Sequence, residues 1–191
     1  VVVVVGGVGD AAQSWAIGHS IAELATQRGK RPVDLFCSLA ADDRLMATAL
    51  HEIGNEENVR TIMQHPAHTA GSDGILVGGR PQPRGWGTFP RYLAHYAREL
   101  GILTLEEAVR HMTSAPAARL GLVDRGLVRP GMVADLVAFD PERINDTATY
   151  ENPRQTPDGI PHVWLGGVPT VFDGKRTEHC PGRALRSPFS R

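Results

Sequence analysis

The spacing of apolar residues changes along the chain and predicts the order of its elements. Residues 1–5 are an unbroken run of valine that glycines then end, the pattern of a parallel strand covered on both faces. Apolar residues at helical spacing follow and predict a helix over 17–28, which Gly29 should stop. A second helix is expected over 32–50, because its apolar side chains fall on one side. The N-terminal part is thus expected to alternate between strand and helix.

Polar end signals locate the helices that come next. Asn55 is expected to cap a short helix that Pro66 ends, since proline disfavours helical geometry at the residue before it. Residues 67–72 are then expected to form a short strand that delivers Asp73 to its end. Three more helices are expected, over 91–100, from Thr104 with a capping box to Glu107, and over 113–120 with Ser114 as cap.

The period changes again after Gly121, from helical spacing to strand spacing. A Leu-Gly-Gly-Val sequence at 165–168 predicts a hairpin turn. Strands are expected over 127–128, 134–139, 162–165 and 170–172. We therefore expect one unit over 1–121 and a second, β-rich unit over 122–191.

The segment 74–90 differs from its neighbours because it is rich in glycine and proline, which disfavour regular structure. It is expected to be a long surface loop, and such loops are uncommon unless they are functional or disordered. Trp86 and Phe89 argue against disorder, since large apolar side chains favour burial. They could line a substrate pocket or serve as ordinary packing anchors.

Composition narrows the class of protein. The chain of 191 residues is short for a closed barrel of eight strand-helix units, which needs ~250 residues. Its net charge of -1, from 20 basic and 21 acidic side chains, points to neither nucleic acid nor a membrane. Cys37 and Cys180 lie too far apart in sequence to indicate a sulfur-ligated zinc site or a disulfide framework, so a cytoplasmic location is expected.

The two ends of the valine run also carry information. The apolar run ends at Gly6 and no basic residue precedes it, so it fits neither a signal peptide nor a membrane-spanning helix. The chain does not begin with methionine. We therefore expect it to be a piece of a longer protein.

The segment 71–74, Gly-Ser-Asp-Gly, carries the most informative chemistry. A lone carboxylate at the end of a strand can bind a metal ion and carry a proton, and Asp73 is placed for both. Arg84 follows in the loop, with a planar guanidinium that pairs two-pronged with a carboxylate. The same residues also suit a tight turn and an arginine that bonds loop carbonyls. The residues alone leave both alternatives open.

Further short phrases occur in a fixed order. The first group is Glu-Glu-Asn-Val at 56–59, His-Pro at 65–66, Gly-Ser-Asp-Gly at 71–74, Arg-Pro-Gln-Pro-Arg at 80–84 and Gly-Thr-Phe-Pro-Arg at 87–91. The second group is Met-Thr-Ser-Ala-Pro-Ala at 112–117, Gly-Leu-Val-Asp-Arg-Gly at 121–126, Gly-Met-Val-Ala-Asp-Leu-Val at 131–137 and Phe-Asp-Pro at 139–141. Together they closely resemble the N-acyl-D-amino-acid deacylases, the D-aminoacylase branch of the amidohydrolase superfamily. The phrase at 131–141 is shared across the superfamily, whereas the phrases at 71–91 are specific to the deacylase branch.

The resemblance implies an α/β fold: the C-terminal part of a (β/α)8 barrel followed by a small β-sandwich module. Residues 1–5 would be about the seventh strand, and those from 122 onward the C-terminal share of the sandwich. Asp73 matches the catalytic carboxylate at the end of the eighth strand and a metal ligand of the family. Arg84, with Ser72 and Gly74 beside Asp73, is expected to bind substrate. Arg80 is a weaker candidate for that role.

The resemblance also implies the reaction, which is zinc-dependent hydrolysis of the amide bond of N-acyl-D-amino acids. Zinc lowers the pKa of bound water to ~7 and polarises the carbonyl. Asp73 would pass the proton of the water to the leaving nitrogen, a contribution of ~10²–10⁴-fold. The substrate is a small molecule. Gln82 stands where the family usually has histidine.

The family's other metal ligands include a His-x-His pair, a bridging cysteine and two more histidines. No His-x-His occurs in this chain, and Asp73 alone cannot hold zinc. We therefore expect the isolated chain to be inactive, with the missing N-terminal part of the same enzyme as its partner. His65 and His68 are expected to be structural, because Pro66 breaks their helical spacing. The other histidines, His111 among them, are expected on the surface.

Two other functions are consistent with the sequence. One is another cyclic-amide hydrolase of the superfamily, similar to dihydroorotases or hydantoinases. The other is a non-catalytic fragment or partner subunit that keeps the scaffold without the metal.

Overall fold

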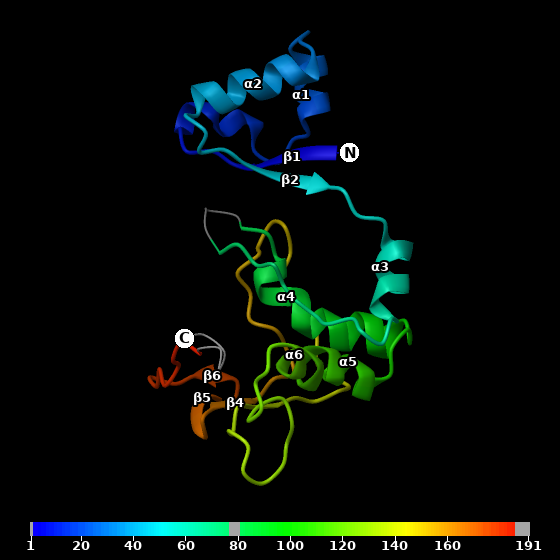
Figure 1. The fold of residues 1–191 in the computed structure, drawn as a ribbon. Coiled ribbons are helices and arrows are strands. Elements are labelled where there is room, and N and C mark those ends of the chain that lie inside the picture. Colours follow the sequence, from blue (N-terminus) through cyan, green and yellow to red (C-terminus); the bar gives the residue numbers. More distant parts are fainter. Residues whose placement is uncertain (1, 77–80, 186–191) are drawn as a thin grey trace.

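The computed structural model describes residues 2–76 and 81–185. The chain runs from an N-terminal layer of two strands and three helices, through a group of central helices, to a small sheet near the C-terminus (Figure 1). The helix α3 (Glu56–Met63) carries the chain from the first layer to the central helices. The candidate site lies where this path turns back toward the N-terminal layer.

The N-terminal layer is a two-stranded antiparallel sheet covered by helices. Its strands are β1 (Val2–Gly7) and β2 (Thr48–Glu52), and its helices are η1 (Ala11–Ala16), α1 (Ile21–Gln27) and α2 (Pro32–Asp42). The buried cluster between them contains Val5, Leu24, Leu35 and Leu39, each at most 3% exposed. Burial of aliphatic side chains on this scale is the main force that holds the layer together.

The expected pairing of the valine run and the expected end of the second helix are both wrong. The valine run pairs antiparallel with β2 rather than in a parallel ladder. The second helix ends at Asp42 rather than at residue 50, because Arg44 and Leu45 have φ values of 54° and 63°, which no right-handed helix accepts. The next residues then supply the hydrogen-bonding partner that β1 needs.

The end of α1 agrees with the prediction, but its start does not. Gly29, with φ of 61°, ends the helix as expected. The helix begins at Ile21 rather than 17, because Ser20 and Glu23 form a reciprocal capping box there. Asn55 caps α3 as predicted, accepting from the backbone N–H of Asn58 at 3.0 Å.

The central helices pack around a second core. They are α3, α4 (Arg84–Arg91), η2 (Tyr92–Glu99), α5 (Leu105–Met112) and α6 (Ser114–Arg119). The buried members of this core are Met63, Tyr92, Leu93, Tyr96, Leu103, Ala108 and Ile144. Arg98 joins η2 to the segment that follows, donating to the carbonyl oxygens of Pro141 at 3.0 Å and Ile144 at 2.7 Å.

The predicted loop over 74–90 is partly helical, which corrects the expectation. The helix α4 begins at Arg84 and buries Gly87 and Pro90, although both residues disfavour helices. Gly87 packs against Asp146, since an added Cβ would lie 3.2 Å from its Oδ2. Packing has overridden local propensity. Phe89 is 44% exposed rather than buried, and the expected loop residues 77–80, Arg80 included, lie outside the described part.

The expected strand over 67–72 is not formed. In the described part of the chain no strand pairs with this segment, because β1 has β2 as its partner. One backbone bond holds the segment instead, from the N–H of Ala70 to the carbonyl of His111 at 2.9 Å. Asp73 therefore follows an extended segment rather than a paired strand.

The small sheet at the C-terminal end is antiparallel, as the strand spacing predicted. Its order is β3 (Leu136–Ala138), β4 (His162–Leu165), β5 (Val168–Phe172) and β6 (Lys175–Arg176). The predicted hairpin is present, with Gly166 and Gly167 at φ of 59° and 81°. Residues 127–128 are not a strand, and Ser114 is the first residue of α6 rather than its cap.

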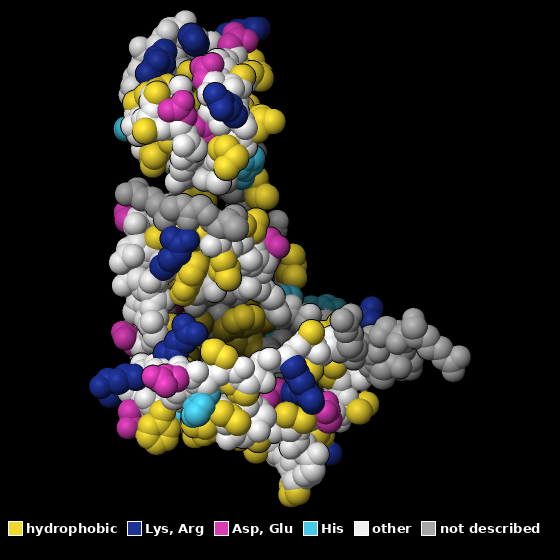
Figure 2. Space-filling model, turned by 90° about the vertical axis from the view of Figure 1, so that its left-hand side faces the viewer, with side chains coloured by type: hydrophobic (Ala, Val, Ile, Leu, Met, Phe, Trp, Pro, Cys, Tyr) yellow, Lys and Arg dark blue, Asp and Glu magenta, His cyan; other side chains and the backbone are white. Residues whose placement is uncertain are grey.

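Charges are mixed on the surface. Figure 2 shows Lys and Arg interspersed with Asp and Glu on the face that it presents. Cys37 and Cys180 are both free and exposed. Among the described helices, none combines the length and the apolar character that crossing a membrane requires.

Candidate functional site

The structure brings together the two residues that the sequence singled out. Arg84, the first residue of α4, places Nη2 2.9 Å from Oδ2 of Asp73. The Asp73 side chain is 87% exposed and that of Arg84 is 35% exposed, so the pair lies at the surface with the guanidinium more enclosed. A carboxylate that can move a proton and a guanidinium that can bind a carboxylate thus share one position.

The backbone of the turn explains how they meet. Asp73 has φ of 45°, a left-handed conformation that aspartate tolerates better than most residues. The hydroxyl of Ser72 accepts from the backbone N–H of Gly74 at 3.2 Å. An added Cβ on Gly74 would lie 3.0 Å from Cα of Gly85, so the turn and the first turn of α4 touch backbone to backbone. Glycine at both positions permits this approach.

One atom of Arg84 stands out. Its Nε is buried and has no hydrogen-bond partner among the described residues. Buried polar groups are almost always paired, so a lone buried N–H calls for a partner. A carboxylate is the acceptor that a guanidinium binds best, through two parallel bonds. The arrangement can therefore bind a carboxylate next to Asp73.

The donors for a metal ion are incomplete. In residues 2–76 and 81–185, no three His, Cys, Asp or Glu side chains lie together in a way that could hold a metal. Asp73 offers one oxygen ligand, and a zinc site needs three or four protein ligands. The described residues therefore fit one share of a metal site and not a whole one.

An apolar cavity lies between the N-terminal layer and the segment before α4. Its volume is about 310 Å³. Pro81 and Gln82, which precede Arg84 by three and two residues, form part of its wall. The rest of the lining includes Val4, Val5, Ile17, Leu50, His51 and Tyr150. Trp86 and Phe89, for which the sequence left a pocket role and a packing role open, are not among its lining residues.

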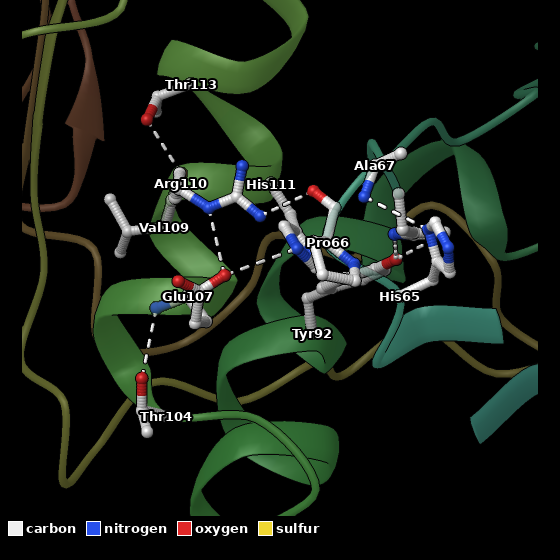
Figure 3. Close-up of polar contacts among 11 residues, drawn as sticks. His65, Pro66, Ala67, Tyr92, Thr104, Glu107, Val109, Arg110, His111 and Thr113 are labelled. Atoms are coloured by element: carbon white, nitrogen blue, oxygen red, sulfur yellow. Dashed lines mark hydrogen bonds and ion pairs between the residues drawn. The ribbon is translucent and has the colours of Figure 1, made fainter. Parts of the chain in front are cut away.

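A cluster of polar side chains supports the segment that leads to Asp73 (Figure 3). The guanidinium of Arg110 on α5 donates to the carbonyl of Pro66 at 2.8 Å and to Glu107 at 2.9 Å. Thr104 accepts from the backbone N–H of Glu107 at 3.2 Å, which is half of the predicted capping box. The carboxylate of Glu107 faces Arg110 and His111 instead of returning to Thr104.

His111 corrects the expectation that it lies on the surface. It is 1% exposed, and neither ring nitrogen has a hydrogen-bond partner in the described part of the chain. Its Nε2 lies 3.5 Å from a carboxylate oxygen of Glu107. Ala108 and His111, three residues apart, are the buried residues of α5, so helical spacing was the signal that could have revealed it.

Two histidines and a tyrosine in this cluster have shifted ionisation. Burial lowers the pKa of His68. Burial, then Arg110 and His68, lower the pKa of His111, while Glu107 acts in the opposite direction. Burial raises the pKa of Tyr92 to about 12. All three groups are therefore neutral at pH 7.

Fold and site together define a class of protein. Residues 4–171 match the sequence profile of the amidohydrolase family, and the chain belongs to that family. Its α/β fold is that of the family, with helices and two small antiparallel sheets in the described part.

The curated relatives that the chain resembles are deacylases of N-acyl-D-amino acids. The chain is 42% identical over 168 residues to the D-aminoacylase of Alcaligenes xylosoxydans xylosoxydans, covering 88% of this chain and 34% of that protein. It is 40% identical over 171 residues to the N-acyl-D-aspartate deacylase of the same organism, covering 89% of this chain and 33% of that protein. The chain spans about a third of the length of these relatives.

The solved structures that the chain resembles come from the same group of relatives. The crystal structure of D-aminoacylase superposes with a TM-score of 0.84 and 37% identity, over 94% of this chain and 36% of that one. N-acyl-D-glutamate deacylase from Bordetella bronchiseptica, complexed with zinc and a phosphonate mimic of the tetrahedral intermediate, superposes with a TM-score of 0.78 and 34% identity, over 91% of this chain and 36% of that one. D-aminoacylase has a binuclear metal center, and the N-acyl-D-glutamate deacylase structure contains zinc.

Proposed function

We propose that this chain supplies the Asp73–Arg84 part of the active site of a zinc-dependent N-acyl-D-amino-acid deacylase. The reaction releases a carboxylate and a free D-amino acid. The observation that carries the proposal is the 2.9 Å approach of Arg84 to Asp73, beside a guanidinium Nε that is buried and unpaired in the described part. The similarity to D-aminoacylase and N-acyl-D-aspartate deacylase supports the substrate class.

Asp73 is the proposed proton carrier. Water attacks the acyl carbon, its proton passes to a carboxylate oxygen of Asp73, and Asp73 returns the proton to the nitrogen as the C–N bond breaks. The side chain is 87% exposed in this chain, so a substrate can reach it. Zinc, when bound, would activate the water and polarise the acyl carbonyl. Asp73 would be one of its ligands.

Arg84 is the proposed clamp for the substrate carboxylate. An N-acyl amino acid has its carboxylate one carbon from the scissile nitrogen, so the clamp and the proton carrier must be neighbours. Ser72 and Gly74 flank Asp73 and are proposed to contact substrate through the hydroxyl and the backbone. The cavity next to Pro81 and Gln82 is proposed to receive the apolar part of the substrate, since ligand sites are mostly apolar with a few polar groups.

The remaining parts of the enzyme lie outside this chain. Residues 1–121 are proposed to belong to the last strand-helix units of a (β/α)8 barrel. Residues 122–191 are proposed to be the C-terminal share of a small β-sandwich. The other zinc ligands would come from an N-terminal part of the same enzyme, so the isolated chain should be inactive.

The test is Asp73→Asn in the full-length enzyme. The amide cannot accept the proton, so kcat should fall by ~10²–10⁴-fold. Circular dichroism should be unchanged, because the side chain is exposed. Activity would be measured on N-acyl-D-amino acids, their L-enantiomers and cyclic imides. A near-normal kcat for Asp73→Asn would refute the mechanism, and turnover of the cyclic imides alone would point to a cyclic-amide hydrolase.

A further inference from the structure

The segment that leads to Asp73 is held by side chains of α5 and η2, since no strand pairs with it in the described part. Arg110 donates to the carbonyl of Pro66 at 2.8 Å (Figure 3). The carbonyl of His111 accepts from the N–H of Ala70 at 2.9 Å. Ala70 precedes Asp73 by three residues. The position of the carboxylate therefore depends on how this segment sits against α5.

His68 is the side chain of the segment that enters this contact. The hydroxyl of Tyr92 lies 3.3 Å from the His68 ring nitrogens. The rings of His68 and Tyr92 are stacked, with centroids 6.1 Å apart. The ring of His111 also lies close, 5.3 Å from that of His68, centroid to centroid. The imidazole of His68 thus contacts both elements that support the segment.

A proton on either imidazole would disturb this packing. His111 is 1% exposed, and the charged groups that face it are Glu107 and Arg110 from its own helix. Glu107 already accepts from Arg110 at 2.9 Å, and its side chain is 48% exposed, so it opposes only part of a buried positive charge. His68 faces His111 from the segment and Tyr92 faces His68 from η2. An uncompensated buried charge favours a move toward water.

We propose that His68 and His111 are positioning residues for Asp73. As neutral imidazoles they hold the segment 65–73 against α5 and η2, and protonation of the buried His111 releases it. The inference rests on the proposed function in one respect, that Asp73 is the catalytic carboxylate. The release of the segment itself is a property of this chain and is measurable without turnover.

The test follows the segment and the histidines together, by nuclear magnetic resonance on the 191-residue chain between pH 8 and pH 5. The ring signals of His68 and His111 report protonation, and the exchange protection of the Ala70 amide, corrected for intrinsic rate, reports the contact. Protection should fall at least tenfold in step with protonation. Stable Ala70 protection while both rings take up protons would overturn the proposal, and this readout needs no variant.

A matched pair of variants isolates the cause. His111→Leu removes the titrating group from the buried site and should abolish the acid loss of Ala70 protection. His179→Leu makes the same change at an exposed histidine and should leave the acid loss intact. If His111→Leu loses protection on acidification as the wild type does, the proposal is wrong.

The last arm uses the full-length enzyme. The acid limb of kcat/KM should move to lower pH in His111→Leu, with KM at pH 8 unchanged, whereas a merely structural role would lower activity equally at every pH. A wild-type enzyme with no deacylase activity would refute the proposed function, and the Ala70 measurement would still decide the positioning.

Discussion

Replacing Arg84 separates substrate binding from stability. Arg84→Met keeps the length of the side chain and removes every N–H donor. A hydrogen bond to a charged group contributes about 1.5–3 kcal/mol, which corresponds to about a 10- to 150-fold loss in kcat/KM. Arg84→Lys keeps the charge without the planar fork, so its kcat/KM should lie between those of the wild type and Arg84→Met.

The same change should barely affect folding. Asp73 is 87% exposed, and an exposed ion pair contributes only about 0–1 kcal/mol. The unfolding midpoint of the chain in urea should therefore move little. The two effects differ because the substrate would meet the buried Nε, whereas Asp73 meets Nη2 at the surface.

The assay compares two amides in the full-length enzyme, an N-acyl-D-amino acid and the corresponding N-acyl amine without the carboxylate. Arg84→Met should slow the first substrate and leave the second unchanged. Arg91→Met is the matched control, since Arg91 lies at the other end of α4 and pairs with Asp146 at 3.6 Å. Equal losses on both amides, or the same loss from Arg91→Met, would refute the clamp.

Three further outcomes are expected in the chain itself. Asp43→Ala should destabilise it by about 2–4 kcal/mol in urea unfolding, because the buried carboxylate accepts from Gly9 at 3.0 Å and Asp10 at 2.6 Å, and both donors would lose their partner; an effect below 1 kcal/mol would contradict this. Gly159→Ala should destabilise the chain by about 1–3 kcal/mol in urea unfolding, because Gly159 has φ of 75° and the new Cβ would lie 2.5 Å from the backbone N of Ile144. Gly174→Ala, at an exposed glycine, is the matched control. The free energy of unfolding should fall as the pH drops below about 6.5, because the lowered pKa values of His68 and His111 mean that the unfolded chain takes up protons at higher pH than the folded chain. A free energy of unfolding that stays constant down to pH 5 would exclude this linkage.

Local sequence signals correctly located those turns and helix ends that depend on neighbouring residues alone. The hairpin at Gly166 and Gly167 needs two residues in left-handed geometry, which glycine alone adopts freely, so the turn could be read directly. Asn55 was recognised as a cap because its oxygen meets a backbone N–H only three residues on. Such contacts depend on neighbours along the chain, and the sequence contains them in full.

Contacts between distant residues could not be read in this way. The partner of β1 lies more than 40 residues away, so the valine run indicated a strand but not its antiparallel direction. Gly87 is helical because it packs against Asp146, which overrides its low propensity. The burial of His111 likewise depends on the segment that covers it.

The candidate site likewise has features that the sequence determined and features that only the tertiary structure determined. The sequence by itself determined that Asp73 stands in a glycine-flanked turn and that an arginine follows it, and the resemblance of the surrounding phrases indicated the deacylase branch. Only the tertiary structure decided that Arg84 reaches Asp73, because the turn and α4 touch where Gly74 meets Gly85. The tertiary structure alone also brought His68 of the segment 65–73 next to the buried His111 of α5. Backbone contact and burial are set by packing between elements, which no short stretch of sequence contains.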